Sequence, residues 1–498
     1  MHRTGSFELA AEAVGIVAAE GSNRRKPVRV TILENTMAVD TLIHGGTVVH
    51  AHGSEQASVG IVGEKIVGIY AHGSEPDAAE RIDATGKLVI PGAVDAHSHH
   101  REGTLPGFEY KETLVTASQA CAAGGVTTSF AMPNITPPPN TAERLTELLD
   151  LYDKRFIVDY NVNAAGTVPT EIPTLATMGV AALKVFMVVD TGRDYPHMPG
   201  IGVHDHGKLM EIFETCAAAN IPLMVHPHDQ PLMDYIEAQF WQRGERDALA
   251  YAKAYAAHDG LIWETAIGML LRMQRATGVH LHLLHVHTSG SLDLIRDAKA
   301  RGQKVTCEVN PWALFLGNRW ENIEKWGSYA LSYYVPEKNT EPIWQALNDG
   351  TLDIIATDHA PHTRAEKEVG WEDGWKAHTG TPSTQFYLSM FLTAAQQGLI
   401  STEGVVRATS TAPADIFHLP NKGRIAIGYD ADIVLIDPNV DHAITDEEVL
   451  SLIGWSPYKD HKLTSRPVRT LLRGTTVYAD GKVTGAEGFG RQAVAVRD

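Results

Sequence analysis

The sequence has little cysteine, a shortage of positive charge and no long apolar run, and each of these shortages excludes a class of protein. Three cysteines, Cys121, Cys216 and Cys307, occur in 498 residues. They are too few for a disulfide framework and lack the spacing of a metal finger, so we expect buried core residues and a cytoplasmic location. No apolar run approaches the roughly 20 residues of a membrane span, so we expect no membrane partner.

The acidic balance of the chain argues against a nucleic-acid-binding role. Asp and Glu number 60 against 42 Lys and Arg, which gives a formal net charge of -18. Recognition of nucleic acids or anionic membranes needs clustered basic residues. The balance still permits a small anionic substrate held by one or two local arginines. With 44% hydrophobic residues and 24 histidines, the chain has a globular profile that is rich in imidazole.

Short strand patterns with glycine turns occupy both ends of the chain. They run over 37–86, where "DTLIHGGTVVHAHGS" is typical, and over 419–485, where "RGTTVYADG" restarts a strand after a glycine turn. We therefore predict one small β-sandwich domain formed by both segments. Residues 1–36 lack the features of a secretory signal and are predicted to be an N-terminal extension, with a C-terminal tail over 486–498.

Strand and helix patterns alternate over 87–418 and predict a (β/α)8 TIM barrel of the α/β class. Eight largely apolar segments are the strand candidates, as expected of strands that are buried on both faces of a parallel sheet. They are "KLVIPGAVDAHSH", "VTTSFAMPN", "FIVDYNVNA", "AALKVFMVV", "PLMVHPHD", "HLHLLHVHT", "KVTCEVN" and "LDIIATDHA". Polar or ionisable residues end nearly every strand, at the face where barrels place their active sites.

The first of these strands ends in "DAHSHHREG", which suggests part of a metal site. Alternate residues of an extended strand share a face, so one face should carry Asp95, His97, His99 and Arg101. His100 should point the other way. Two imidazoles two residues apart can bind one metal ion, and the arginine would reach further into the pocket.

Lys184 stands inside the apolar strand "AALKVFMVV", where an unpaired ammonium is costly. A carboxylate partner or a position at the strand rim would relieve that cost. Alternatively, a lysine with a lowered pKa reacts with carbon dioxide, and the resulting carbamate is an anion that can bridge two cations. In that case Lys184 is a metal ligand.

Three further strands supply the remaining candidate ligands. Two of them end in histidine pairs that share one face, namely His226 with His228 and His285 with His287. Spacing alone leaves open which member of each pair binds metal. His280 and His282 lie earlier in their strand, on the opposite face, and are predicted to be packing or helix-facing residues. Asp358 ends the strand in "IIATDHAPH", where a carboxylate can bind a metal and move protons. Ligands from five strand ends of one barrel predict a dinuclear metal site.

These motifs resemble those of the amidohydrolase superfamily, specifically its cyclic-amidase branch of dihydroorotases, allantoinases and hydantoinases. The resemblance covers residues 38–485, where "PGAVDAHSH", "LKVFM", "VHPHD", "LLHVH" and "ATDHAPH" occur in family order. It implies two divalent metal ions, usually zinc, bridged by an N6-carboxylysine that Lys184 forms with carbon dioxide. The implied ligands are His97, His99, carboxylated Lys184, His226, His285 and Asp358.

The resemblance also implies a reaction. Hydroxide between the two ions attacks the carbonyl carbon of a cyclic amide, while one ion polarises the carbonyl oxygen. Asp358 accepts the proton and returns it to the leaving nitrogen, so that the ring opens. Relatives of this kind are commonly homodimers or homotetramers, and we expect the same of this chain.

Three residues resemble the carboxylate-binding set of dihydroorotases, namely Arg101 in "HHREG", Asn134 in "AMPNITPPP" and His362 in "DHAPH". A planar guanidinium can hold a carboxylate through two hydrogen bonds. The alternatives are a rim salt bridge for Arg101 and a turn role for Asn134. We therefore expect a dihydroorotase-like enzyme that acts on a carboxylate-bearing ring.

Other positions depart from the known members of this branch. Hydantoinases and dihydropyrimidinases carry a tyrosine five residues after the lysine, where this chain has Val189. Dihydroorotases usually have "REP" and a proline followed by paired histidines, where this chain has "REG" and "EVNPWALF". A long loop contains Arg193, Asp194, Tyr195 and His197. This loop either satisfies its own polar groups or forms a pocket for a different or larger substrate.

Three alternatives are open. An allantoinase or a hydantoinase or dihydropyrimidinase type of hydrolase would act on a neutral ureide ring. A non-enzymatic scaffold of the same fold would have lost its metals, although all six implied ligands are present here. An exocyclic deacetylase or deaminase would often lack the bridging lysine.

Overall fold

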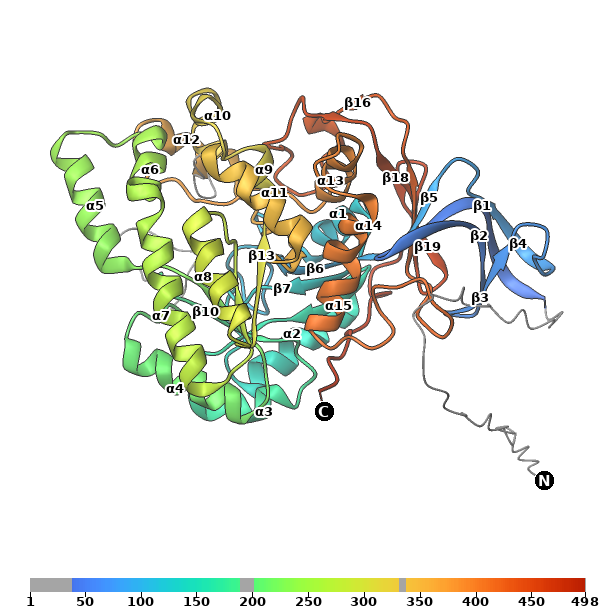
Figure 1. Ribbon diagram of the computed structural model, residues 1–498, viewed down its shortest axis with the longest axis horizontal. Coiled ribbons are helices and arrows are strands. Elements are labelled where there is room, and N and C mark those ends of the chain that lie inside the picture. The colour runs from blue at the N-terminus through green and yellow to red at the C-terminus, as the bar shows by residue number, and fades with distance from the viewer. Residues whose placement is uncertain (1–37, 189–200, 331–336, 498) are drawn as a thin grey trace, which may run out of the picture. The chain divides into compact units, whose positions relative to one another are not determined.

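The computed structural model describes residues 38–188, 201–330 and 337–497 (Figure 1). The N-terminal extension predicted over 1–36 lies outside the described residues, as do Val189, Arg193, Asp194, Tyr195 and His197. Within the described part of the chain, no helix has the length and apolar character needed to cross a membrane.

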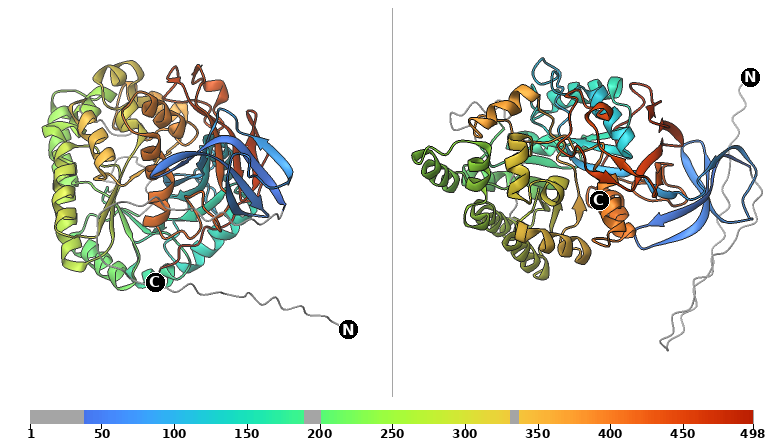
Figure 2. Two further views of the ribbon diagram at one scale, coloured as in Figure 1. Left: turned by 45° about the vertical axis from the view of Figure 1, so that its right-hand side comes forward. Right: turned by 90° about the horizontal axis from the view of Figure 1, so that it is seen from above.

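One sheet takes its strands from both ends of the described chain (Figures 1 and 2). Its N-terminal strands are β1 (Val39–His50), β2 (Gly53–Val62), β3 (Lys65–Ala71), β4 (Ala78–Asp83) and β5 (Leu88–Pro91). Its C-terminal strands are β15 (Ile433–Asp437), β18 (Arg466–Leu472), β19 (Thr475–Ala479) and β20 (Lys482–Val483). The strand order is β20-β19-β18-β15-β5-β1-β2-β3, and β4 pairs with β1. A separate short pair is formed by β16 (His442–Ala443) and β17 (Lys462–Leu463).

β5 belongs to this sheet and not to the barrel. It pairs in parallel with β1 and antiparallel with β15. Pro91 has no N–H to donate to a ladder, and a β-carbon on Gly92 would stand 2.1 Å from the Thr127 side chain. The predicted strand "KLVIPGAVDAHSH" is therefore two strands, and the first barrel strand begins at Ala93.

Eight strand positions form the barrel. They are β6 (Ala93–Ser98), β7 (Val126–Ala131), β8 (Asp159–Val162) continued by β9 (Ala164–Ala165), β10 (Leu183–Phe186), β11 (Leu223–His226), β12 (Leu281–Leu283), β13 (Val305–Val309) and β14 (Ile354–Ile355). Parallel pairing runs from β6 to β8 and from β9 to β14. A parallel bridge between Ser98 and His359 joins the last position to the first. The predicted TIM-barrel fold with its sheet-rich terminal domain is confirmed.

Helices cover the barrel strands from outside (Figures 1 and 2). The longer ones are α1 (Leu114–Gly124), α2 (Ala142–Arg155), α4 (His206–Ala218), α5 (Gln230–Gln242), α6 (Ala248–Tyr255), α7 (Leu261–Thr277), α8 (Ser289–Ala300), α11 (Thr340–Asp349) and α13 (Tyr387–Gln396). The shorter ones are α3 (Ile172–Ala176), α9 (Pro311–Phe315), α10 (Trp320–Trp326), α12 (Arg364–Glu368), α14 (Thr402–Val406) and α15 (Ala412–Ile416). Side-chain oxygens of Thr141, Asp205 and Thr288 cap α2, α4 and α8 at their first turns.

The C-terminal segment closes the barrel at the amino ends of its strands. Ala493 and Ala495 belong to an apolar cluster with Phe417 and inward side chains of the barrel strands. The Ala493 N–H donates to the Tyr160 carbonyl at 2.7 Å, and the Ala495 N–H donates to the Gly179 carbonyl at 3.0 Å. The segment predicted as a tail over 486–498 is, in its described part, a floor of the barrel. The carboxyl ends of the strands are left for the site.

A buried ion cluster joins the barrel to the sheet. The Nζ atom of Lys422 lies 2.6 Å from Asp159 of β8, 2.7 Å from Asp432 and 3.0 Å from Asp430. Asp159 also accepts a hydrogen bond from Arg473 of the sheet-rich domain. Burial by itself would lower the pKa of Lys422, but the three carboxylates outweigh this effect and raise it. The buried charges therefore compensate one another.

Candidate active site

His97, His99 and Asp358 converge at the carboxyl ends of β6 and β14. One ligand atom from each lies within 4.8 Å of the other two. The Nε2 atoms of both imidazoles are 3.1 Å from Oδ1 of Asp358. The backbone of Asp358 is left-handed, with φ of 46°, a conformation that surrounding structure must impose on an L-residue. Imidazole and carboxylate donors at this spacing suit zinc.

The charges around these donors favour a cation. Burial by itself would raise the pKa of the Asp358 carboxyl, but His97 and His99 hold it well below its usual range. Burial would likewise lower the pKa of His97, yet Glu308 and Asp358 outweigh it and raise the pKa to about 9. Two buried carboxylates thus stabilise positive charge here, and a metal ion supplies such charge.

Glu308 on β13 is a further residue of this site and was not among the predicted residues. Its Oε1 atom lies 2.5 Å from Nδ1 of His97. A carboxylate at Nδ1 keeps the proton there and leaves Nε2 to face a metal. A glutamate inside the apolar strand "KVTCEVN" is a sequence signal of the same kind as Lys184.

His226 and His285 extend the group of imidazoles. Nε2 of His285 lies 2.8 Å from Nδ1 of His226, and the ring centres of His285 and His97 are 6.1 Å apart. Burial lowers the pKa values of His226 and His285 well below their ordinary value. Both imidazoles are therefore neutral, which is the form that binds a metal.

The second member of each histidine pair makes other contacts, although the ring centres are 6.4 Å apart in the first pair and 6.3 Å apart in the second. Nε2 of His228 is 3.1 Å from the Gln230 side-chain oxygen. The ring of His287 packs edge-on against Trp263, with ring centres 4.9 Å apart. The backbone at His285 is left-handed, with φ of 37°, so strand alternation does not continue through this pair. The first members, which the family resemblance implies as ligands, contact each other directly.

Lys184 on β10 lies within electrostatic range of Glu308 and Asp358. Its side chain is fully buried, and among the described residues its Nζ atom has no hydrogen-bond partner. Burial lowers its pKa to about 7, against the opposing effect of the two carboxylates. Such a buried amine can react without breaking a hydrogen bond. A pKa near 7 also means that a large fraction of it is neutral and nucleophilic at neutral pH.

Arg101 follows the histidines of β6 in a left-handed turn, with φ of 63°. Its side chain is 1% exposed, and its Nε and Nη1 atoms have no partner within the described ranges. Its Nη2 atom lies 3.1 Å from Nε2 of His362. Burial lowers the pKa of Arg101 to about 10, so the guanidinium stays charged at neutral pH. A buried cation with open N–H groups is unfavourable until an anion reaches it.

Asn134 is close to the metal donors and is also buried. Its Oδ1 atom accepts a hydrogen bond from Nδ1 of His99 at 2.6 Å. The amide oxygen therefore orients a histidine of the site, and only the Nδ2 group is left for a substrate.

A buried polar cluster surrounds His362. Nζ of Lys111 lies 2.6 Å from Oε1 of Glu366, 3.2 Å from Nδ1 of His362 and 3.1 Å from Nδ1 of His378. Two histidines and a glutamate at this spacing can hold a metal ion. The Lys111 ammonium already supplies the positive charge among them. No sequence motif marks Lys111, because "YKETL" reads as an ordinary charged segment before a helix.

Two neighbours of these residues, on β6 and just after it, are held by hydrogen bonds of their own. His100 points away, with its ring nitrogens bonded to side chains of α2 and β7. Asp95, predicted to share a face with His97, accepts hydrogen bonds from the Thr357 hydroxyl at 2.6 Å and from the His97 N–H at 3.4 Å. The register of β6 against β7 shifts between Asp95 and Ser98.

His282 is a packing residue, but it faces the barrel interior. It is fully buried, its Nε2 atom lies 3.4 Å from Glu308, and its ring centre is 5.2 Å from that of Phe417 in the floor. His280 bonds Thr306 at 2.9 Å nearer the start of the strand. His282 therefore supports the Glu308 carboxylate that orients His97.

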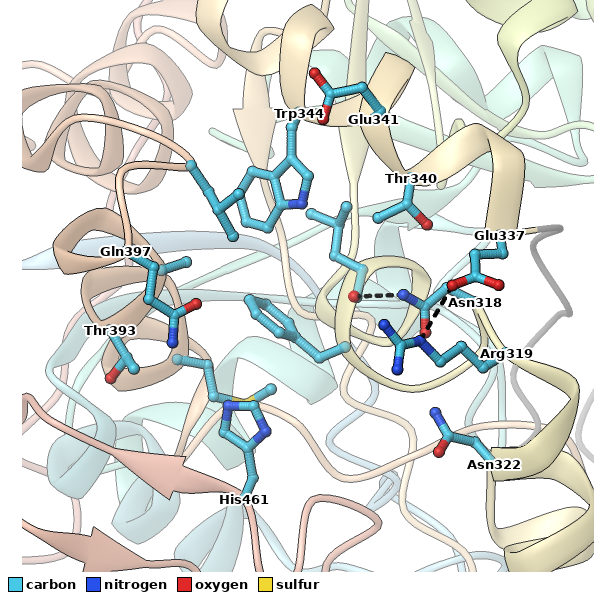
Figure 3. A pocket seen from close by; sticks show the side chains of 15 residues that line it. Asn318, Arg319, Asn322, Glu337, Thr340, Glu341, Trp344, Thr393, Gln397 and His461 are labelled. Atoms are coloured by element: carbon cyan, nitrogen blue, oxygen red, sulfur yellow. Dashed lines mark hydrogen bonds and ion pairs between the residues drawn. The ribbon is translucent and has the colours of Figure 1, made fainter.

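A separate cavity of about 570 Å³ lies among α9, α11 and α13 (Figure 3). Its lining includes Trp344, Thr393 and His461, and Arg319 forms an ion pair with Glu337 at 3.4 Å. None of the predicted site residues lines it, and no group of metal ligands converges among its described lining residues. The chemistry is therefore placed at the strand ends and not in this cavity.

The sequence matches the amidohydrolase family over residues 88–477. It is 30% identical to the L-hydantoinase of Paenarthrobacter aurescens over 462 residues, which cover 91% of this chain and 97% of that protein. It is 32% identical to the dihydroorotase of Halobacterium salinarum over 428 residues, which cover 82% of this chain and 94% of that protein. The solved structure of L-hydantoinase (dihydropyrimidinase) from Arthrobacter aurescens matches with a TM-score of 0.85 at 29% identity, covering 92% of this chain and 100% of that one.

These matches span the barrel and reach into the sheet formed by the two ends of the chain. They agree with the converging imidazole and carboxylate donors at the strand ends. The chain therefore belongs to the amidohydrolase family, in its cyclic amidohydrolase branch, and is a hydrolase that acts on carbon–nitrogen bonds of cyclic amides.

Proposed function

We propose that this enzyme uses two zinc ions to open a cyclic amide ring that bears a carboxylate, as a dihydroorotase does. The proposed ligands are His97, His99, Lys184, His226, His285 and Asp358. All six are buried, and the donor types suit zinc. Five of them lie near or just beyond the carboxyl ends of barrel strands, and Lys184 lies inside β10. Two divalent ions held there would lower the pKa of a water between them and polarise the amide carbonyl.

The proposed bridge between the ions is Lys184 after carboxylation. Its neutral amine attacks the carbon of carbon dioxide, a proton leaves the nitrogen, and the product carbamate carries one negative charge. The buried Nζ atom without a partner among the described residues supports this modification. A carbamate would offer two oxygen donors and the negative charge that two dications need.

Asp358 is the proposed proton carrier. Its Oδ1 atom faces both His97 and His99, so its carboxylate stands at the edge of the metal site. Its lowered pKa keeps it ionised, and only the ionised carboxylate can accept the proton of the attacking water. It then delivers this proton to the amide nitrogen as the carbon–nitrogen bond breaks.

The observation that carries the carboxylate proposal is the open guanidinium of Arg101. Its Nε and Nη1 groups are buried without a described partner, next to His362 and close to the metal histidines. A substrate carboxylate would satisfy these groups through charge-assisted hydrogen bonds. A neutral ring would leave the charge buried and unpaired.

Dihydroorotate and dihydrouracil test this proposal, because the two rings differ by a single carboxylate. We expect kcat/KM for dihydroorotate to exceed that for dihydrouracil by about 100-fold, which is the effect of a charge-assisted pair. Arg101→Met should remove most of this difference by raising KM for dihydroorotate. Equal losses on both rings in the variant would remove Arg101 from the carboxylate pocket.

A hydantoinase acting on a neutral ureide ring is the second candidate. It is favoured by the L-hydantoinase relative at 30% identity and by the L-hydantoinase structure with its TM-score of 0.85. The comparison of dihydroorotate with dihydrouracil is therefore extended to a 5-substituted hydantoin and to allantoin. Faster hydrolysis of either neutral ureide than of dihydroorotate would assign the second function and reject the first.

Metal analysis separates both enzymes from a metal-free scaffold of the same fold. We expect two zinc ions per chain in protein from zinc-supplemented cells. A purified chain without any divalent metal would contradict both hydrolytic proposals.

A further inference from the structure

Lys111 is a buried lysine that the metal centre does not use. It lies in the segment between β6 and α1 and has no exposed surface. Its Nζ atom is within hydrogen-bond distance of Glu366, His362 and His378, at 2.6, 3.2 and 3.1 Å. An ammonium has three N–H donors, so each of these acceptors can receive one.

These bonds decide which nitrogen of His362 carries the proton. Nδ1 accepts from Lys111, so in the neutral imidazole the proton is on Nε2. The Nε2–H group donates to the Thr379 carbonyl at 3.0 Å. The other tautomer would direct an N–H at the ammonium and a lone pair at the carbonyl. Burial, together with Arg101 and Lys111, holds the pKa of His362 well below its ordinary value, so the imidazole stays neutral.

The same tautomer determines what Arg101 can bind. Its Nη2 atom lies 3.1 Å from Nε2 of His362, but a protonated Nε2 has no lone pair to accept from it. Its Nε and Nη1 atoms also lack an acceptor within the described part of the chain. The whole guanidinium is therefore available to an external anion.

We propose that Lys111 is a positioning residue of the substrate pocket, which fixes the Nε2–H tautomer of His362 and thereby keeps Arg101 open for the substrate carboxylate. This inference rests on the proposed function, because it assumes a carboxylate-bearing ring. Without Lys111, the proton of His362 can move to Nδ1, where a carboxylate oxygen of Glu366 lies 3.8 Å away. Nε2 then accepts a hydrogen bond from Arg101, and the substrate must displace that bond.

Kinetics on the matched rings test this role. Lys111→Met should raise the ratio of KM for dihydroorotate to KM for dihydrouracil about tenfold, the effect of one competing hydrogen bond, with kcat for dihydroorotate within about threefold. The double variant Lys111→Met/Glu366→Gln should raise this ratio of KM values by the same amount. It also removes the Glu366 carboxylate, which Lys111→Met alone would leave without the ammonium. Lys376→Met removes an exposed positive charge from the same region and should leave the ratio unchanged.

The tautomer itself can be read by nitrogen NMR of protein labelled with 15N-histidine. The His362 signals are assigned by their loss in His362→Gln. We expect an Nε2–H imidazole in the wild type and an Nδ1–H imidazole in both Lys111 variants. An unchanged tautomer, with or without a raised KM ratio, would overturn the role of Lys111, and so would an unchanged ratio. A wild-type enzyme that does not prefer dihydroorotate would instead contradict the proposed function.

Discussion

At the residue scale, two buried cationic side chains are incomplete without something added to the chain. Lys184 has an amine without a hydrogen-bond partner among the described residues, inside a barrel strand, and Arg101 has open guanidinium groups just after the histidines of β6. Burial without partners is unfavourable for both. Carboxylation would resolve the first and a substrate carboxylate the second, so the two residues make separate predictions.

Lys184→Ala should abolish metal bridging and lower kcat/KM by at least about 100-fold, because a metal ligand is lost. Zinc content should fall below two ions per chain, as measured by mass spectrometry of the purified protein. Short carboxylic acids such as propionate should restore part of the activity by filling the position of the carbamate. The exposed Lys208→Ala serves as control and should keep full activity. An unaffected Lys184→Ala variant would refute the dinuclear proposal.

The pKa of Lys184 predicts how the site assembles with pH. Burial lowers this pKa to about 7, so the amine is protonated at pH 6 and mostly neutral at pH 8. Only the neutral amine attacks carbon dioxide, so reactivation of metal-free protein by zinc and bicarbonate should be about tenfold slower at pH 6 than at pH 8. Above pH 8 the rate at fixed dissolved carbon dioxide should level off. A rate that keeps rising to pH 10 would indicate an ordinary lysine pKa.

At the element scale, apolar runs located all eight barrel strands, because strands buried on both faces need such runs. These apolar runs do not show where the pairing register between two strands shifts. The pairing of β6 with β7 is irregular around Asp95, and a left-handed turn occurs at His285. Glu308 was detectable as a carboxylate in an apolar strand. Lys111 was not, because its partners come from residues more than 250 positions away along the chain.

The Lys422 cluster predicts how firmly β8 and the sheet-rich domain are joined. Lys422→Met leaves the buried Asp432 carboxylate without a cation, while Asp159 keeps Arg473 and Asp430 keeps Lys65, so the free energy of unfolding should fall by about 3–5 kcal/mol. Urea unfolding followed by circular dichroism measures this change. Lys65→Met is the matched control, because its Nζ atom lies 2.6 Å from Asp430, one of the same carboxylates, but its side chain is 43% exposed. Loss of that exposed ion pair should lower the free energy of unfolding by less than about 1 kcal/mol. Equal losses of stability in both variants would contradict the account of the cluster.

At the scale of the whole molecule, both ends of the described chain build one sheet, and the C-terminal segment continues past it to the barrel floor. The two glycine-rich segments and their short strands predicted one β-sandwich domain built from both ends, and their strands pair in one main sheet. The floor was not predicted, because a few small apolar residues give no strand signal and their partners at Tyr160 and Gly179 are distant in sequence. The three cysteines are buried and unbridged. A cytoplasmic location and a homodimeric or homotetrameric assembly stay predictions, the latter open to light scattering of the purified protein.

The floor makes a prediction about the molecule as a whole, because neighbouring residues of the C-terminal segment face opposite ways. Ala495 is 7% exposed within the apolar cluster, whereas Val496 is 59% exposed. Ala495→Glu places a carboxylate among Phe417 and the inward barrel residues, so it should lower the free energy of unfolding by at least about 3 kcal/mol. Val496→Glu, one residue away, should change it by less than about 0.5 kcal/mol. Thermal unfolding of both variants measures the difference, and equal stability would mean that the segment does not close the barrel in solution.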